Sequence, residues 1–538
     1  MIKKCFAILL AVMMVLSLLT ACSGKTSTDT ANGTTEAANT SDSSTSSSGT
    51  SSGEGRTDVI IATAQEPTVF FCQDSNFASN QAKDSPVLFQ IYENLTWMSE
   101  DGTLEPWVAT EWESNEDGTE WTFTLRDDVY FSNGDKLTAE DAAFSFNLCL
   151  ETNPALAGNL LINLDHAEAI DDTHVKFYLT APFAGFVAET STRAGFLIDK
   201  SYYDEVGAEG YNNAPIGTGA YTLKSRVSGQ EIILEANENY WGGAPAIKTI
   251  KILPISNVST QFISLKSGDI DVINIADVAS CQQLPENGDV TWFTVPSAAR
   301  LCMSFNDQPG GTRWSNNKDF RKAVQYAVNK EDILIGSNSG AGTILDIDPP
   351  ASYAGCPDAG TYNVIEQDLD KAKEYLDASG YNGETVKVIC MAGTQQEKVA
   401  NILQGQLMAI GINAEISATD SGTYYAAQGT TLDYDMNIWV TSSSLNDISS
   451  CNTQYLTQKY GPIMTRQDET DALCLKANEE GDPEARKAIF LELMNIVQEE
   501  AYTVPFYNSD SVMALSKNLN GVTLNPNNAW RVMNWSWN

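Results

Sequence analysis

The hydrophobic pattern of this chain changes near residue 300, and this change constrains the fold more than any other feature. Before it, short runs alternate apolar and polar residues, as half-buried strands do. The expected strands are 58–63, 121–125, 129–131, 174–179, 220–223, 231–235, 247–255 and 271–275. Thr138 and Asp141 have the spacing of a capping box and predict a helix start. The sequence predicts a strand-rich first half.

The second half has the pattern of an α/β lobe. Its expected elements are helices at 320–328 and 369–376, strands at 386–390 and 412–416 with a helix at about 396–410 between them, a strand at 434–440, and a helix beginning at Asp482-Pro483. A crossover helix between two short strands implies a parallel pair. Two lobes that differ in secondary structure usually leave a cleft between them, and such clefts are favoured ligand sites.

Composition and charge narrow the class of protein. Hydrophobic residues make up 42% and charged residues 19% of 538 residues, which suits a globular body of about two or three domains without a further membrane segment. The formal charge of -38 argues against a nucleic-acid partner, because such partners are bound by clustered Lys and Arg. It also argues against adsorption to anionic lipid.

The N-terminus has the pattern of an export signal. Lys3 and Lys4 precede an apolar run of about 14 residues, whereas a membrane-spanning helix needs about 20. Thr20 and Ala21 then lead into Cys22, and this arrangement resembles the bacterial lipoprotein signal. The resemblance implies that Cys22 is acylated and anchors the chain to the extracytoplasmic face of the membrane. Ordinary secretion with Cys22 as a bystander is the alternative.

A tether follows the signal. Residues 23–57 consist mainly of Ser, Thr, Gly, Ala and Asp, and they hold too few large apolar side chains to fold. In the flexible regime such a segment has a root-mean-square span of roughly 30 to 35 Å. The match to the hydrolase pattern G-x-S-x-G at 49–53 lies inside this low-complexity segment and carries no catalytic meaning.

The cysteines and histidines argue against a metal site. No C-x-x-C pair occurs among the eight cysteines beyond Cys22, whose wide spacing favours buried thiols or a few structural bridges. The only histidines, His166 and His174, flank a turn and are expected at the surface. We therefore expect no metal and no catalytic cofactor.

Six blocks of sequence are shared with a known family. They are YENL at 92–95, the stretch 121–146 with FSNG at 131–134 and LTAED at 137–141, PIGTGAY at 215–221, NENYW at 237–241, LKSGDID at 265–271 and FRKAV at 320–324. Together they resemble the peptide/nickel class (family 5) of solute-binding proteins that feed ATP-binding-cassette importers. The match runs from about Thr57 to the C-terminus. Most of these residues are expected to be structural, with Gly217 and Gly219 as turn residues rather than phosphate binders.

The resemblance implies an α/β, two-lobed periplasmic-binding-protein-like fold with central mixed sheets, a hinge and an additional domain in the first lobe. The expected organisation is a signal peptide at 1–21, the tether at 22–57, a first lobe at 58–298 with the extra β-rich domain at about 85–210, a second lobe at 299–504 and a C-terminal return to the first lobe at 505–538.

The chain departs from the family where other members bind peptides. In those members the strand matching 434–439 continues into G-W-x-x-D, whose Asp pairs with the terminal ammonium of the peptide. Here Val440, Thr441 and Ser444 hold the Gly, Trp and Asp positions. Asp447, three residues further on, is the candidate replacement for the missing Asp.

Other candidate ligand residues lie around this strand. Trp439 offers an aromatic face to a sugar ring or an apolar side chain, although buried strand tryptophans are common as well. The loop from Thr441 to Asp447 includes Ser442 and Ser444, whose hydroxyls would suit a neutral ligand. The remaining candidates are Trp314, Tyr424 and Tyr425.

These observations favour a monomeric, membrane-tethered receptor that hands a solute to an ATP-binding-cassette permease. We expect a short peptide, with an oligosaccharide or another neutral polar solute second and nickel third. An exported enzyme is disfavoured, because no Ser/His/Asp arrangement, metal-ligand spacing or phosphate loop occurs outside the tether. A glycoside hydrolase-like pair of carboxylates among the 70 acidic residues stays open, as does a receptor that signals without transport.

Overall fold

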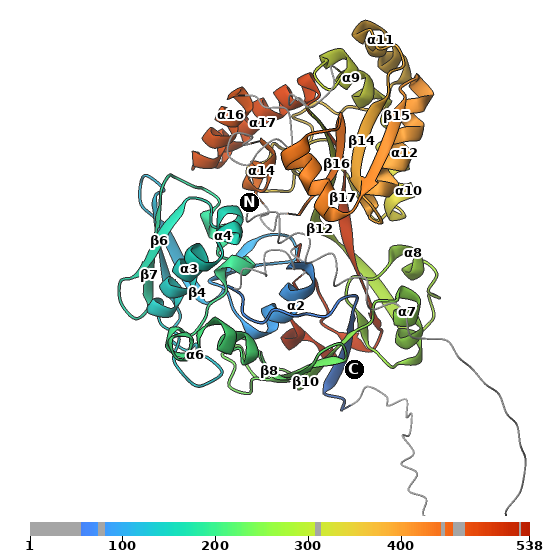
Figure 1. Ribbon diagram of the computed structural model, residues 1–538. Helices are drawn as coiled ribbons and strands as arrows, with labels where there is room; N and C mark the ends of the chain where they lie inside the picture. Colours follow the sequence, from blue (N-terminus) through green and yellow to red (C-terminus); the bar gives the residue numbers. More distant parts are fainter. Residues whose placement is uncertain (1–54, 74–80, 307–313, 443–446, 456–467, 527–528) are drawn as a thin grey trace, which may run out of the picture. The chain divides into compact units, whose positions relative to one another are not determined.

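The computed structural model describes residues 55–73, 81–306, 314–442, 447–455, 468–526 and 529–538, which belong to one compact unit (Figure 1). Cys22 and almost all of the predicted tether lie outside the described residues. Within these ranges, none of the helices combines the length and the apolar character that a membrane crossing requires.

A mixed eleven-stranded sheet runs through the unit. Its strand order is β15–β14–β16–β12–β17–β11–β1–β10–β9–β8, with β13 paired to β17. β1 is parallel to β10 and β11, β14 is parallel to β15 and β16, and the other pairs are antiparallel. The strands are β1 (Asp58–Thr63), β8 (Tyr221–Val227), β9 (Glu231–Ala236), β10 (Thr249–Pro254), β11 (Val272–Ile273), β12 (Val290–Phe305), β13 (Gly342–Ile344), β14 (Val386–Met391), β15 (Ala414–Thr419), β16 (Met436–Ser442) and β17 (Thr503–Ser516).

β12 and β17 cross between separate apolar cores. Val290 and Leu515 pack into cores built mainly by residues 59–298 and the C-terminal segment, whereas Leu301 and Phe506 pack into a core built by residues 301–507. We call residues 55–298 and 509–538 the first lobe and residues 299–508 the second lobe. The pairing of β12 with β17 shifts register twice, between Pro296 and Arg300 and between Leu301 and Cys302. Such irregularities bend a strand and sharpen its twist.

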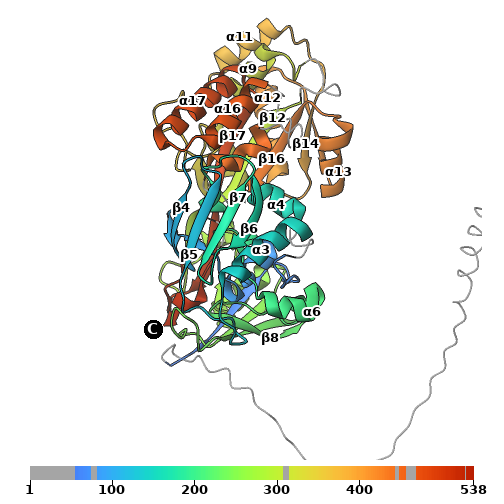
Figure 2. The same ribbon diagram turned by 90° about the vertical axis from the view of Figure 1, so that its left-hand side faces the viewer.

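The first lobe carries a second sheet, β4–β5–β7–β6, which is antiparallel throughout and has α3 beside it (Figure 2). The predicted strands at 121–125 and 174–179 are confirmed as β5 and β7, and the capping box between Thr138 and Asp141 opens α3. The predicted strand at 129–131 is wrong, since Tyr130 makes only an isolated bridge to Lys136. The elements are α2 (Gln81–Ile91), β2 (Thr96–Met98), β3 (Leu104–Pro106), β4 (Ala109–Ser114), β5 (Glu120–Leu125), α3 (Ala139–Thr152), α4 (Pro154–Leu160), β6 (Leu164–Ala169), β7 (His174–Leu179), α5 (Phe186–Glu189), η2 (Arg193–Gly195), α6 (Lys200–Asn213), α7 (Val258–Ser267), α8 (Val278–Cys281), β18 (Leu519–Asn520), η5 (Val532–Asn534) and β19 (Ser536–Trp537).

The second lobe follows the predicted α/β pattern. β14, α12 and β15 form the expected parallel pair with its crossover helix, and Gly411 ends α12 in the left-handed conformation that glycine favours. Asp482 caps α17 as predicted. The helices are α9 (Lys318–Ala327), α10 (Lys330–Asn338), α11 (Leu369–Ser379), α12 (Gln395–Ile410), α13 (Ser421–Ala426), η3 (Ala427–Thr431), η4 (Ile448–Cys451), α14 (Asn452–Tyr455), α16 (Asp468–Glu479) and α17 (Pro483–Glu500).

The shared sequence blocks have structural roles in the first lobe. A Cβ on Gly217 would lie 2.0 Å from the Ile91 carbonyl oxygen, and one on Gly219 would lie 2.4 Å from the Gln90 oxygen. Both glycines therefore permit a close backbone approach, which is a structural role. The two histidines are surface residues as predicted, with 41% of the His166 side chain and 40% of the His174 side chain exposed.

A lysine with a lowered pKa gives a prediction for the second lobe. The Lys330 side chain donates to the Leu345 carbonyl at 2.6 Å, and burial lowers the pKa of its ammonium to about 8, although Asp346 nearby opposes this effect. The unfolded chain binds this proton up to a pKa of about 10.4, so folding releases it between pH 8 and 10. The free energy of unfolding should therefore rise by about 2 kcal/mol over this window in the wild type relative to Lys330→Met. Denaturant titrations of both proteins at pH 7.5 and 10 measure the difference, and identical pH profiles would contradict it.

Candidate functional site

One face of the paired strands β12 and β16 is polar although it is buried. On the other face, Leu301, Met303 and Ile438 pack into the second-lobe core. Side chains alternate along a strand, so the residues between them share the opposite face. The register pairs are Arg300 with Thr441, Cys302 with Trp439 and Ser304 with Asn437, and all six residues are buried. We call these six residues the polar face.

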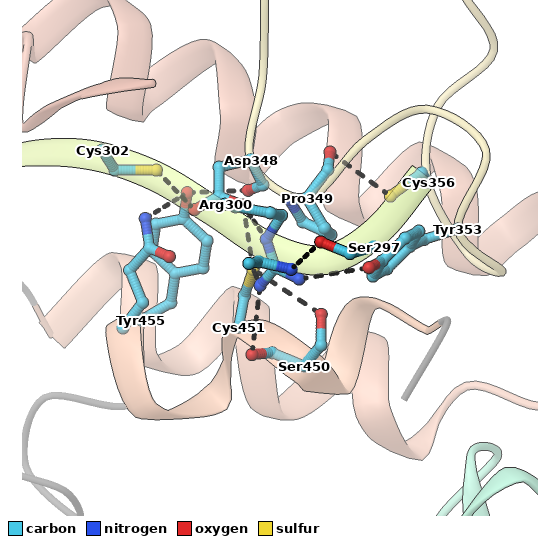
Figure 3. A network of polar contacts seen from close by, with 12 residues as sticks. Ser297, Arg300, Cys302, Asp348, Pro349, Tyr353, Cys356, Ser450, Cys451 and Tyr455 are labelled. Atoms are coloured by element: carbon cyan, nitrogen blue, oxygen red, sulfur yellow. Dashed lines mark hydrogen bonds and ion pairs between the residues drawn. The ribbon is translucent and has the colours of Figure 1, made fainter. Parts of the chain in front are cut away.

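Arg300 lies at the centre of a buried network (Figure 3). Its Nε donates to Asp348 Oδ1 at 2.5 Å, and the two side chains are 0% and 1% exposed. The Cys302 thiol donates to the other carboxylate oxygen at 3.2 Å, and Arg300 Nη2 lies 3.6 Å from the sulfur of Cys451. Tyr353 also lies in reach, with its hydroxyl 3.4 Å from Arg300 Nη1. Because Asp348 precedes the 349–356 loop and Cys451 ends η4, this network ties both segments to β12.

The charges of this network compensate one another. Burial alone would lower the pKa of Arg300, but Asp348 holds that pKa well above its usual value. Burial, together with the Asp348 carboxylate, raises the pKa of the thiols of Cys302 and Cys451 well above the usual range. Both thiols are therefore protonated and are poor nucleophiles and poor metal ligands. All eight described cysteines are buried and free, which agrees with the prediction of buried thiols.

Asp447 is held in a second buried ion pair. Its Oδ2 lies 2.5 Å from Arg486 Nη1 and its Oδ1 lies 2.7 Å from Nη2, so the contact is bidentate. The side chains of Asp447 and Arg486 are 5% and 7% exposed. Asp447 also caps η4 by accepting from Ser449 N at 2.9 Å. Both of its carboxylate oxygens are thus occupied within the second lobe.

The first lobe reaches the second lobe beside this ion pair. Ala184 N donates to the carbonyl oxygen of Asn478, near the end of α16, at 3.0 Å. Gly185 faces Asp447 so closely that an added Cβ would lie 3.2 Å from its Oδ1. Arg486 Nε donates to the Ala477 oxygen at 2.8 Å, so the same arginine holds both second-lobe segments that the first lobe approaches here.

The structure brings together only part of the predicted ligand residues. Trp439 and Thr441 lie on the polar face, and Tyr424 joins them because its hydroxyl lies 2.9 Å from Asn437 Oδ1. Tyr425 is 61% exposed, and Trp314 packs in the second-lobe core against Phe320.

The loop after β16 is described only in part. Ser442 is the last residue of β16 and pairs with Ala299. Ser444 lies outside the described residues. Asp447 is described and lies in the ion pair with Arg486.

Three donors of the polar face have no hydrogen-bond partner in the part of the chain that the structure describes. They are the hydroxyl of Ser304, Nδ2 of Asn437 and Nε1 of Trp439, whose residues are 0%, 0% and 4% exposed. Buried polar groups are nearly always paired, so adjacent unpaired donors call for an explanation. Neutral donors of this kind suit carbonyl, carboxylate or hydroxyl oxygens of a ligand. No group of three or more His, Cys, Asp or Glu side chains in the described ranges is arranged to hold a metal ion.

Sequence reasoning missed the two arginines of this region. Arg300 interrupts an apolar strand, which is a visible signal, because a charged residue is buried there only with a partner. Its partner Asp348 is 48 residues away, and no local pattern connects them. Arg486 sits in the first turns of α17, where the sequence gives no sign that its guanidinium turns back to Asp447.

Comparisons with known proteins agree with this architecture. The nickel-binding periplasmic protein of Escherichia coli is 25% identical over 467 residues, which cover 79% of this chain and 85% of that protein. The glutathione-binding protein GsiB of Escherichia coli is 25% identical over 492 residues, covering 87% and 92% respectively. The unliganded open structure of MppA, a periplasmic murein tripeptide binding protein, has a TM-score of 0.74 at 21% identity over 90% of this chain and 98% of that one.

The family assignment rests on a match over most of the chain. Residues 103–461 match the family described as "Bacterial extracellular solute-binding proteins, family 5 Middle". The match covers the whole β4–β5–β7–β6 sheet, both register shifts of β12 and the entire polar face. It confirms the resemblance that the shared sequence blocks indicated. This chain belongs to the family 5 bacterial extracellular solute-binding proteins.

Proposed function

We propose that this protein is a lipid-anchored receptor that captures a short peptide between its lobes and delivers it to an ATP-binding-cassette permease. The observation that carries the proposal is the polar face, where Ser304, Asn437 and Trp439 hold three buried donors without partners. Peptide carbonyls and the terminal carboxylate are acceptors of matching chemistry. Closure of the lobes would bury the ligand and present a new surface to the permease.

The terminal ammonium of a peptide would meet a different carboxylate from the one in family members that carry the G-W-x-x-D Asp. We infer that Asp447 contributes to this region, but its carboxylate already accepts two hydrogen bonds from Arg486. An added ammonium would share that carboxylate with a guanidinium, which weakens its attraction. We therefore expect less dependence on a free amino terminus than in family members with the G-W-x-x-D Asp. An oligosaccharide or another neutral polar solute is the second candidate, because neutral donors alone line the unpaired part of the face.

Trp439→Phe tests the polar face. The change removes the Nε1 donor and keeps an aromatic ring, so a ligand that hydrogen-bonds there should bind about three- to tenfold more weakly. Loss of the unpaired donor should not itself destabilise the unliganded protein, so any fall in its melting temperature reflects the smaller volume of the phenylalanine ring at this buried position. Trp292→Phe in the first lobe is the matched control, since Trp292 packs against an apolar cluster away from the polar face. Unchanged affinity in Trp439→Phe would remove this tryptophan from the site.

Cys22→Ser tests the anchor. Two acyl chains hold a protein on a bilayer far better than one, so loss of the modified cysteine should release the chain. We expect the wild type in the membrane fraction and Cys22→Ser in the supernatant after cell fractionation. Cys5→Ser, inside the same signal region, is the control and should stay in the membrane fraction. Equal partitioning of wild type and Cys22→Ser would mean that the chain is not a lipoprotein.

A further inference from the structure

A cavity of about 400 Å³ lies beside the crossing strands, away from the polar face. It is lined by the loop 275–278, the end of α10, the start of α12, and β12 and β17 near their register shifts. Figure 1 shows α8 and α10 on the same side of these strands. No residue of the polar face lines the cavity. Its volume falls within the range of small-molecule sites, and cavities between lobes are favoured places for them.

Two side chains of β17 that line this cavity carry polar groups whose bonding is incomplete. Ser509 is 6% exposed, and its hydroxyl has no hydrogen-bond partner among the described residues. Asp510 is half-buried, and it forms no ion pair with a described cationic side chain. Burial raises the pKa of Asp510, and only the hydroxyl of Thr294 opposes this effect. A half-buried carboxylate without a cation is costly, and a bound cation would remove that cost.

The rim of the cavity holds one residue in an unfavourable backbone conformation. Ile275, which lines the cavity, has a φ of 60°, whereas the φ of 53° at Ser339 is that of the left-handed C-cap of α10. A positive φ is a genuine outlier for a β-branched residue such as isoleucine. Strained residues of this kind cluster at ligand sites, where the surrounding structure holds them in place. Ile275 lies two residues beyond the end of β11 at Ile273.

The charge and size of the lining restrict the ligand. Among the described residues that line it, the titratable groups are Asp277, Asp510 and Lys398, and Asp277 is already engaged in capping α8. A divalent metal requires more charged oxygen ligands than one carboxylate supplies. An ammonium can donate three hydrogen bonds, and on this lining the Asp510 carboxylate and the Ser509 hydroxyl can accept from it. Lys398, an exposed cation on the same lining, opposes any positively charged ligand, so a compound with one positive charge is favoured over one with two.

We propose that this cavity is a second ligand site for a small primary ammonium compound. The ammonium would pair with the carboxylate of Asp510 and donate a hydrogen bond to the hydroxyl oxygen of Ser509. The site is independent of the peptide proposal, because no residue of the polar face takes part. Since both crossing strands line it, its occupant contacts both lobes at once.

Thermal unfolding of the full-length chain with ethanolamine at constant ionic strength and pH 8 tests the proposal. Ethanolamine should raise the melting temperature in a saturable way, and ethylene glycol, which has similar size but no charge, should not. Asp510→Asn keeps the shape of the side chain and should bind ethanolamine about tenfold to hundredfold more weakly, as expected for a lost charge-assisted hydrogen bond. Asp289→Asn, an exposed first-lobe carboxylate outside the cavity, is the matched control and should keep wild-type affinity.

Ser509→Ala provides a milder test in case Asp510→Asn perturbs folding. It removes one acceptor and should weaken binding about three- to tenfold. The proposal is overturned if potassium chloride or ethylene glycol gives the same shift as ethanolamine, if Asp510→Asn and Ser509→Ala both bind like the wild type, or if ethanolamine gives no shift at all. If a peptide raises the melting temperature of Asp510→Asn as much as that of the wild type, the peptide binds independently of this cavity.

Discussion

Replacing Arg300 by methionine should lower the free energy of unfolding by about 3 to 5 kcal/mol. Methionine keeps most of the length of the side chain but removes the charge, and Asp348 would be left buried with its carboxylate unpaired. The thiol of Cys302 and the hydroxyl of Tyr353 cannot neutralise that charge. Urea titration followed by tryptophan fluorescence measures the loss.

The double variant Arg300→Met/Asp348→Leu separates the charge from the packing. Replacing both members of a buried pair by apolar residues is often neutral or stabilising, so the double variant should recover most of the loss. Lys224→Met, which breaks an exposed pair with Glu235, is the control and should cost at most about 1 kcal/mol. If Arg300→Met resembles this control, the buried network does not hold the second lobe together.

Arg531→Met should have a similar effect in the first lobe, with a loss of about 3 to 5 kcal/mol. Arg531 Nη2 lies 2.8 Å from Glu93 Oε2, and the two side chains are 6% and 1% exposed. The Arg531 guanidinium also stacks on Trp97 and Trp107, with its Cζ 3.9 and 4.1 Å from the ring centroids. The variant therefore loses cation–π contacts as well as the ion pair.

Ligand affinity distinguishes Arg531→Met from Arg300→Met, because only Arg300 belongs to the polar face. Glu93 and Arg531 lie in the first lobe, where Arg531 stacks on two tryptophans that pack against its core, whereas the polar face belongs to the second lobe. Arg531→Met should therefore lower stability without changing affinity at temperatures where the protein is folded. Glu93→Leu/Arg531→Met should regain much of the stability. If Arg531→Met is as stable as the wild type, the buried ion pair with Glu93 does not stabilise the first lobe.

Local sequence patterns predicted those elements whose signals are local. The capping box at Thr138 and the helix end at Gly411 each depend on a few neighbouring residues, and both were confirmed. The helix α2 was not predicted, because Pro86 inside it is a residue that normally interrupts helices. β11 is shorter than predicted, because Ile275 adopts a positive φ just beyond it.

The candidate site depends on contacts that no local pattern records. Trp314 and Trp439 were both candidate ligand residues, yet Trp314 packs in the apolar core of the second lobe, whereas Trp439 lies on the polar face of β16. The distinction follows from alternation along β16 and from its register with β12, which only the folded sheet fixes. Glu93 forms its ion pair with Arg531, which is 438 residues away in the sequence. The shared blocks indicated the family, whereas the buried pairs that support those blocks required the structure.

The most direct test of the account is thermal unfolding of the purified, ligand-stripped protein against separate pools of short peptides, N-acetylated short peptides, oligosaccharides and nickel chelates. A ligand at about 100 times its dissociation constant stabilises the folded state by roughly 2.7 kcal/mol, which is readily visible. The account predicts a clear shift with peptides, only modestly reduced by N-acetylation. A shift with oligosaccharides or nickel chelates and none with peptides, or no shift with any pool, would contradict peptide capture by this protein.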